Sequence, residues 1–222
     1  MSDVGALMVF RRPTLTTSIW GLICLAILLA LGFWQLERRE WKQDLIATLE
    51  TRLAKPAVPL PDELSSEWLY RPVLVEGEVA SDQWFRFPGR SVDGEVGDVL
   101  MLLVRLPDGR LAVVQHGAIG FGAELPPLPS GVAKEGIVRD PPEAGLFTPD
   151  NDPEDNEWYS VAPEAMAAAA GLPDAPVLDY YLASADWRPH LPNNHLEYAI
   201  TWFSFAGIFV IIFALFHRRR AK

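Results

Sequence analysis

Two long apolar runs at opposite ends of the chain constrain its fold more than any other feature. Residues 15–36 form a run of 22 residues without a charged side chain, and residues 198–216 form a second run of 19. At about 1.5 Å of rise per helical residue, each run is long enough to cross the hydrocarbon core of a bilayer. The sequence therefore predicts two transmembrane helices, the first an uncleaved signal anchor because no small-residue cleavage pattern follows it.

The charges that flank these runs predict how the chain crosses the membrane. Arg11 and Arg12 precede the first run, and four basic residues follow the second. By the positive-inside rule, both termini lie in the cytoplasm and the segment between the runs lies outside. Three bases at 38–42 oppose this orientation, but a large translocated domain weakens local charge bias, and Glu37 and Glu40 lie among them.

The segment between the runs is acidic and lacks cysteine. Residues 37–195 carry 13 Lys or Arg against 27 Asp or Glu, a net charge of −14. Phosphate binding needs the opposite sign, so nucleic acid is excluded as a partner. The only cysteine, Cys24, lies in the first run, so this segment has neither a disulfide nor a thiol-based copper or zinc motif.

Strand-like runs separated by turn residues predict a mainly β domain in this segment. Apolar residues recur every four positions from Trp41 to Leu53, which extends the first helix outward as a stalk until Pro56. Strands are expected at 71–79, 83–87, 97–106, 110–119, 132–138 and 177–183, with a turn at Asp108-Gly109. A short helix is expected between Pro163 and Gly171.

These patterns define a fold class and a domain plan. The class is an α+β membrane protein in which two transmembrane helices enclose a mainly β, barrel- or sandwich-like extracytoplasmic domain with short helices. The plan comprises a cytoplasmic N-terminus (1–13), helix one (14–36), the stalk (37–55), the β-rich domain (56–194), helix two (195–216) and a basic cytoplasmic tail (217–222).

One helical face at the start of the second run combines a histidine with aromatic and small side chains. His195, Tyr198, Ala199 and Trp202 fall at offsets of zero, three, four and seven, and either Asn193 or Asn194 can cap the helix. Such a face suits a flat apolar macrocycle lying between helices. The residues alone favour the plainer reading, in which aromatic residues form an interfacial belt and the histidine points to water.

The other three histidines and one acidic stretch are weaker candidates for a functional site. His116 lies in an expected strand, His190 lies between prolines, and His217 belongs to the basic tail. No Gly-x-Ser-x-Gly accompanies them, which argues against a Ser-His-Asp hydrolase. The acidic stretch Asp150–Asn156 lacks the central glycine and distal glutamate of a calcium loop, so a solvated turn is favoured there.

Four segments, in this order and spacing, resemble one family. They are residues 12–15 (RPTL), 32–42 (GFWQLERREWK), 147–153 (FTPDNDP) followed by Trp158-Tyr159, and 193–203 (NNHLEYAITWF). Together they resemble the Surfeit locus protein 1 family of assembly factors for haem-copper terminal oxidases. The family's Asn-Arg-Gly-Trp sequence after the central strand is replaced here by Gln115-His116-Gly117-Ala118, which puts the contact made by that loop in doubt.

The resemblance implies a function and a site. It implies a two-pass protein of the bacterial inner membrane with a periplasmic domain, which is not an enzyme and which binds haem a transiently for delivery into oxidase subunit I. His195 would be the axial ligand of the haem iron, Trp202 would pack on the porphyrin, and Tyr198 would be a neighbour. Haem A synthase is a further expected partner.

Two alternatives stay open at the level of sequence. The chain could be a cofactor-free membrane scaffold that stabilises an oxidase intermediate, with His195 serving only as an interfacial polar residue. A haem-modifying enzyme is the weaker alternative, because the chain has too few intramembrane histidines for a multi-haem redox site.

Overall fold

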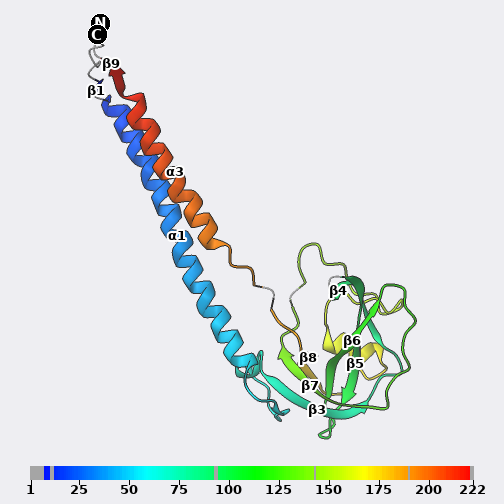
Figure 1. Ribbon diagram of the computed structural model, residues 1–222. Coiled ribbons are helices and arrows are strands. Elements are labelled where there is room, and N and C mark those ends of the chain that lie inside the picture. The colour runs from blue at the N-terminus through cyan, green and yellow to red at the C-terminus, as the bar shows by residue number, and fades with distance from the viewer. Residues whose placement is uncertain (1–7, 11–12, 93–94, 143, 190, 221–222) are drawn as a thin grey trace. The chain divides into compact units, whose positions relative to one another are not determined.

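The computed structural model describes residues 8–10, 13–92, 95–142, 144–189 and 191–220, and Figure 1 draws it as a ribbon. The chain divides into two compact units, and the second of them is Leu49–Pro189. The first unit contains helix α1 (Leu15–Leu53) as far as Thr48 and all of helix α3 (His195–Phe216).

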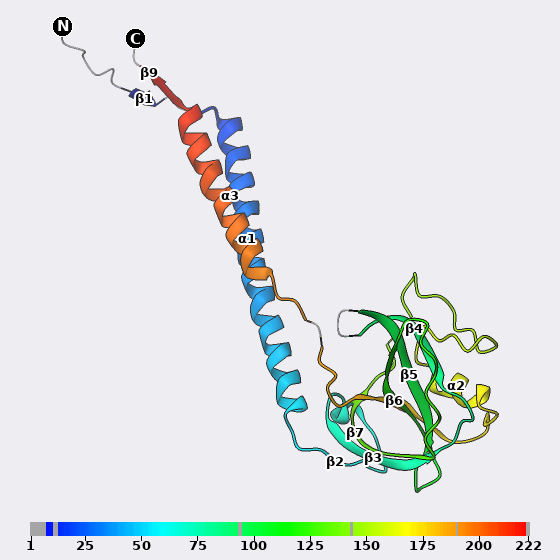
Figure 2. The same cartoon turned by 45° about the vertical axis from the view of Figure 1, so that its right-hand side comes forward.

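Both long helices have the length and composition of membrane spans. The most apolar 18-residue windows of α1 and α3 have mean hydropathies of 2.2 and 2.4, and most of their surface is exposed. The two helices run side by side in both Figure 1 and Figure 2. Two such helices at the two ends of the chain fit a two-pass membrane protein.

The ends of the helix pair hold features that the sequence did not predict. Strand β1 (Met8–Phe10) pairs antiparallel with strand β9 (Arg218–Arg220) beyond the helices. At its other end α1 continues without a break to Leu53, as the four-residue spacing predicts. The Arg52 guanidinium then donates to the carbonyl of Leu69 at 3.2 Å, which ties the last turn of α1 to the loop that follows it.

The second unit is a β domain whose strands lie close to their expected positions. Its elements are β2 (Val58–Pro59), the 3-10 turn η1 (Ser66–Trp68), β3 (Pro72–Val79), β4 (Phe85–Val92), β5 (Glu95–Arg105), β6 (Leu111–Gly120), β7 (Gly131–Arg139), α2 (Pro163–Ala169) and β8 (Val177–Ser184). The short helix begins at Pro163, and Gly171 follows it at φ 74°, as expected for a C′ glycine. β2 and η1 were not predicted.

The sheet closes into a barrel. Its strand order is β2-β3-β7-β8-β6-β5-β4, and β3 also pairs with β5 through Glu78 opposite Arg105 and Val79 opposite Val104. Strands β3, β7, β8, β6 and β5 therefore form a continuous ring. Strand β4 pairs antiparallel with the first part of β5, and β3 pairs with its last residues. The β5–β6 hairpin turns at Gly109, whose φ of 89° requires glycine.

Alternate residues of these strands feed two hydrophobic cores. Along β5, Leu100, Leu102 and Val104 join the barrel core, whose buried members also come from β3, β6, β7 and β8. Met101 and Leu103 point the other way and join a flanking core, which Met166 of α2 covers. The predicted fold class is confirmed: two apolar helices flank, in sequence, a barrel-like β domain with short helices.

Candidate functional site

His195 is the first residue of α3. Asn194 occupies the N-cap position, and its backbone carbonyl accepts hydrogen bonds from the amides of Glu197 and Tyr198 at 3.1 and 3.3 Å. Asn194, one of the two residues expected to cap the helix, is therefore at the cap position, but its side chain makes no capping hydrogen bond. The Oδ1 atom of Asn193 is buried and accepts no hydrogen bond from the described residues. The backbone therefore closes the first turn.

The imidazole of His195 contacts α1. Its Nδ1 lies 2.7 Å from Oε1 of Gln35, and Gln35 is only 8% exposed. Within the described chain, the other ring nitrogen of His195, Nε2, has no hydrogen-bond partner. The imidazole and the amide are thus hydrogen-bond partners of each other. This pairing stabilises the helix pair, because an unpaired polar group is costly to bury in an apolar setting.

Sequence reasoning did not assign Gln35 to the site. The residue lies at the end of the first apolar run and belongs to the segment 32–42 that carries the resemblance. A signal was present in the sequence: Gln35 is the amide side chain of a run without charged residues, and polar side chains inside membrane helices tend to face another helix. What the sequence lacks is the register that sets Gln35 opposite His195.

Direct helix packing surrounds this polar contact. Gly32 of α1 is buried against the ring of Phe203, which also meets Phe33 edge to face at 5.3 Å between centroids. On α3, Ala199 and Ala206 are 1% and 4% exposed. Small residues let membrane helices approach closely, so α1 and α3 are held together by packing at this level.

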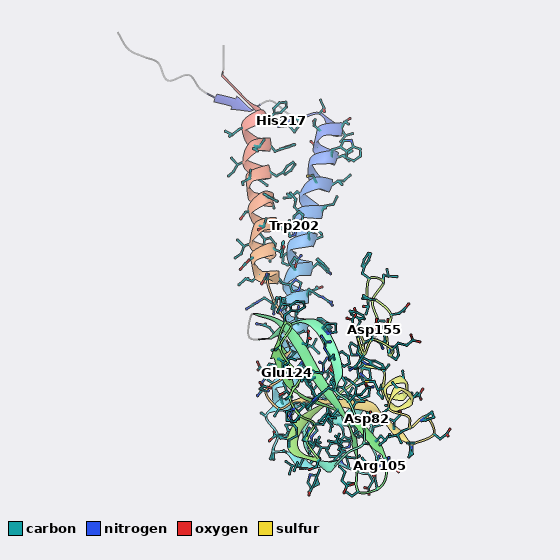
Figure 3. The ribbon with its side chains drawn as sticks, turned by 90° about the vertical axis from the view of Figure 1, so that its right-hand side faces the viewer. Asp82, Arg105, Glu124, Asp155, Trp202 and His217 are labelled. Carbon is teal, nitrogen blue, oxygen red and sulfur yellow. The ribbon has the colours of Figure 1, made fainter. Side chains whose placement is uncertain are left out.

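The other members of the predicted face differ in their exposure. Tyr198 is 56% exposed. Trp202, labelled on α3 in Figure 3, is half-buried and meets Phe205 edge to face at 6.1 Å. The structure thus joins His195 to Gln35 and Trp202 to Phe205. It leaves Tyr198 and part of Trp202 on a flank of α3 that α1 does not cover.

Apolar grooves on the helix pair lie away from His195. One, of about 420 Å³, is lined by residues that include Gly21, Leu25, Phe209 and Phe213, and another, of about 290 Å³, shares three of these. Phe209 follows His195 by 14 residues, or roughly 21 Å along a helix. These grooves therefore lie further along the helix pair and do not contain His195.

The remaining histidines have other surroundings. His116 on β6 packs its ring on Trp84 at 5.1 Å, and Lys134 donates to the carbonyls of Gln115 and His116. Burial, and then the charge of Lys134, hold the pKa of His116 below its usual value. His217 donates from Nδ1 to the carbonyl of Phe213 at 2.8 Å, and Figure 3 labels it at the end of α3. His190 lies outside the described residues.

The acidic stretch at 150–156 is a structured turn. Asn151 Oδ1 accepts from the amides of Tyr159 and Ser160 at 2.8 and 3.0 Å, while Asp152 Oδ1 caps the two amides of Glu154 and Asp155. No group of three or more His, Cys, Asp or Glu suited to a metal ion occurs among the described residues. The hydrogen bonds of Asn151 and Asp152 hold the segment in this turn.

Comparison with known proteins identifies the family. The model of the SURF1 family matches residues 22–207. A SURF1-like protein of Monosiga brevicollis is 30% identical, with 90% of this chain and 87% of that protein covered. Surfeit locus protein 1 of Gallus gallus is 29% identical over 83% and 70%, and a SURF1-like protein of Rickettsia conorii is 25% identical over 91% and 92%.

The matched region includes both Gln35 and His195 as well as the whole β domain. The chain therefore belongs to the SURF1 family.

Proposed function

We propose that this chain is a non-enzymatic assembly factor for a haem-copper terminal oxidase, which holds haem a transiently and aids its delivery into catalytic subunit I. His195 is the iron ligand in this proposal, Trp202 packs on the porphyrin, and Tyr198 is a neighbour. The observation that carries the proposal is the state of His195: one ring nitrogen is held by a buried amide while the other has no partner among the described residues.

The residues present fit a haem. A haem iron is already held by four porphyrin nitrogens, so a single protein nitrogen suffices as an axial ligand, and Nε2 of His195 supplies one. The aromatic surface of Tyr198 and Trp202 lies one and two turns further along the same helix and stays accessible. Bound haem would supply the redox centre of the client oxidase, while the protein residues bind and orient it.

A single protein ligand suits a carrier. It would hold the haem less firmly than two protein ligands would, which would allow release. The proposed setting is the bacterial inner membrane, with both termini cytoplasmic and the β domain periplasmic. Subunit I is the proposed recipient, and haem A synthase is the proposed donor.

A second candidate function is favoured by a specific observation. Ala199 and Phe203 pack directly against α1, and the grooves near Phe213 lie about 21 Å or more along the helix from His195. Helices that pack directly on each other near His195 are what a cofactor-free scaffold for an oxidase intermediate would need. In that case the buried pair of Gln35 and His195 would only fasten the helices together.

Oxidase maturation in cells tests the proposal. A strain that lacks the gene is complemented with wild type, with His195→Ala, or with the matched control His116→Ala, and the haem a content of isolated subunit I is measured at equal protein levels. A carrier requires that His195→Ala leave subunit I deficient in haem a while His116→Ala restores it. Full restoration by His195→Ala would favour the scaffold.

A further inference from the structure

We propose that Gln35 is a positioning residue that fixes His195 in the neutral tautomer protonated on Nδ1, so that the Nε2 lone pair is presented for coordination. The role in coordination rests on the proposed function. The tautomer itself does not, because it follows from the contact between the two helices in the protein alone.

The geometry of the contact gives the direction of the hydrogen bond. The amide oxygen of Gln35, Oε1, faces Nδ1 at 2.7 Å, which is within the range of a good hydrogen bond. A carbonyl oxygen can only accept, so the proton of the bond belongs to the imidazole. A neutral imidazole carries one such proton, and its other nitrogen, Nε2, is then an unprotonated acceptor.

Burial makes Gln35 suitable for holding this tautomer. The residue is 8% exposed and lies on a different helix from His195, so few waters can compete for the bond. Gly32, one turn before Gln35, packs against Phe203, and Ala199, one turn after His195, is buried. The packed positions on both helices therefore fix the separation of the two polar groups.

The amide also suits a site that must release its ligand. Metal-binding histidines usually donate their second N–H to an oxygen acceptor, which sets ring orientation and raises the basicity of the ligating nitrogen. A neutral amide is a weaker acceptor than a carboxylate, so it orients the ring without adding a negative charge. Gln35 would thus orient the His195 ring without making haem binding too tight for release.

The first arm of the test uses the haem-free protein in lipid nanodiscs. Histidine labelled with ¹⁵N reports which ring nitrogen carries the proton, and the signals of His195 are assigned by their loss in His195→Ala. Wild type should show protonated Nδ1 and unprotonated Nε2, Gln35→Leu should lose this preference, and Gln35→Glu should keep the proton on Nδ1. Protonation on Nε2 in wild type, or a Gln35→Leu spectrum identical to wild type, would overturn the proposal.

The second arm measures haem a binding to the same proteins. Loss of an outer-shell partner weakens metal binding by about 10–100-fold, so Gln35→Leu should raise the dissociation constant by that factor, whereas Gln35→Glu should not. Gln43→Leu is the matched control, because Gln43 lies on the same helix and is exposed.

The two arms separate failure of this inference from failure of the proposed function. Equal haem a affinity of wild type and Gln35→Leu would refute the positioning role while leaving His195 as the ligand. A wild-type protein that binds no haem a would refute the carrier function and the coordinating role together. The tautomer would then still be decided by the nitrogen spectra.

Discussion

Replacement of Gly32 by alanine tests the helix packing that positions His195. A Cβ atom at Gly32 would lie 2.6 Å from Cε1 of Phe203, whereas ordinary contacts of a Cβ atom begin at 3.4 Å. The Phe203 ring would have to withdraw by about 0.8 Å or more, and its edge-to-face contact with Phe33 resists this shift. Overpacking of this kind costs about 1–3 kcal/mol, so the association constant of the helix pair should fall roughly 5–150-fold.

The assay separates the two helices by titrating the folded full-length protein with SDS in mixed micelles. Dyes on the native Cys24 of α1 and on a Leu215→Cys site of α3, both exposed, report the helix separation by energy transfer. Gly207→Ala is the matched control, because a Cβ atom there meets nothing within 4 Å. Identical titration midpoints for Gly32→Ala and Gly207→Ala would refute the packing, and Phe203→Leu should partly rescue Gly32→Ala.

Three further outcomes concern the β domain. Gly77→Ala should destabilise the domain in chemical denaturation far more than Gly117→Ala, because a Cβ atom at Gly77 would collide with backbone where β3 meets β5, whereas Gly117 faces open space. Asp98→Asn should cost about 1–3 kcal/mol of unfolding free energy, since the Asp98 side chain is 2% exposed and pairs at 2.7 Å with Arg86, which is 35% exposed and can still reach water; an unchanged unfolding free energy would contradict this. The pKa of His116 is lower in the folded state than the ordinary 6.5, because burial and a nearby lysine oppose protonation, so stability should fall as pH drops below about 6.5. A His116→Gln variant with the same pH dependence as wild type would exclude this cause.

Most of the β domain could be predicted because turn residues separate its apolar runs. Residues 100–104 contribute alternately to the two cores, so the strand is apolar on both faces. Such a run is recognised as a strand from the turn residues that bound it, here Asp108-Gly109. The strand expected at 83–87 lies instead at Phe85–Val92, because Gly89 at φ 67° continues the strand across a register shift rather than ending it.

The candidate site was predicted only in part, because a helical face does not say how much of itself a partner helix covers. Spacing placed His195, Tyr198 and Trp202 together, yet α3 buries Ala199 and leaves Tyr198 exposed. Gln35 escaped prediction for the same reason, since pairing across helices depends on a register that neither helix encodes alone. The pairing of Met8–Phe10 with the basic tail is likewise a contact between distant short segments without a strong pattern of their own.

The haem a content of the purified protein tests the central claim most directly. The chain is produced together with haem A synthesis, and its absorption spectrum and haem a to protein ratio are compared between wild type and His195→Ala. We expect wild type to carry haem a and His195→Ala to lose most of it. A wild type without haem a, or a His195→Ala protein with an unchanged spectrum and stoichiometry, would contradict the account.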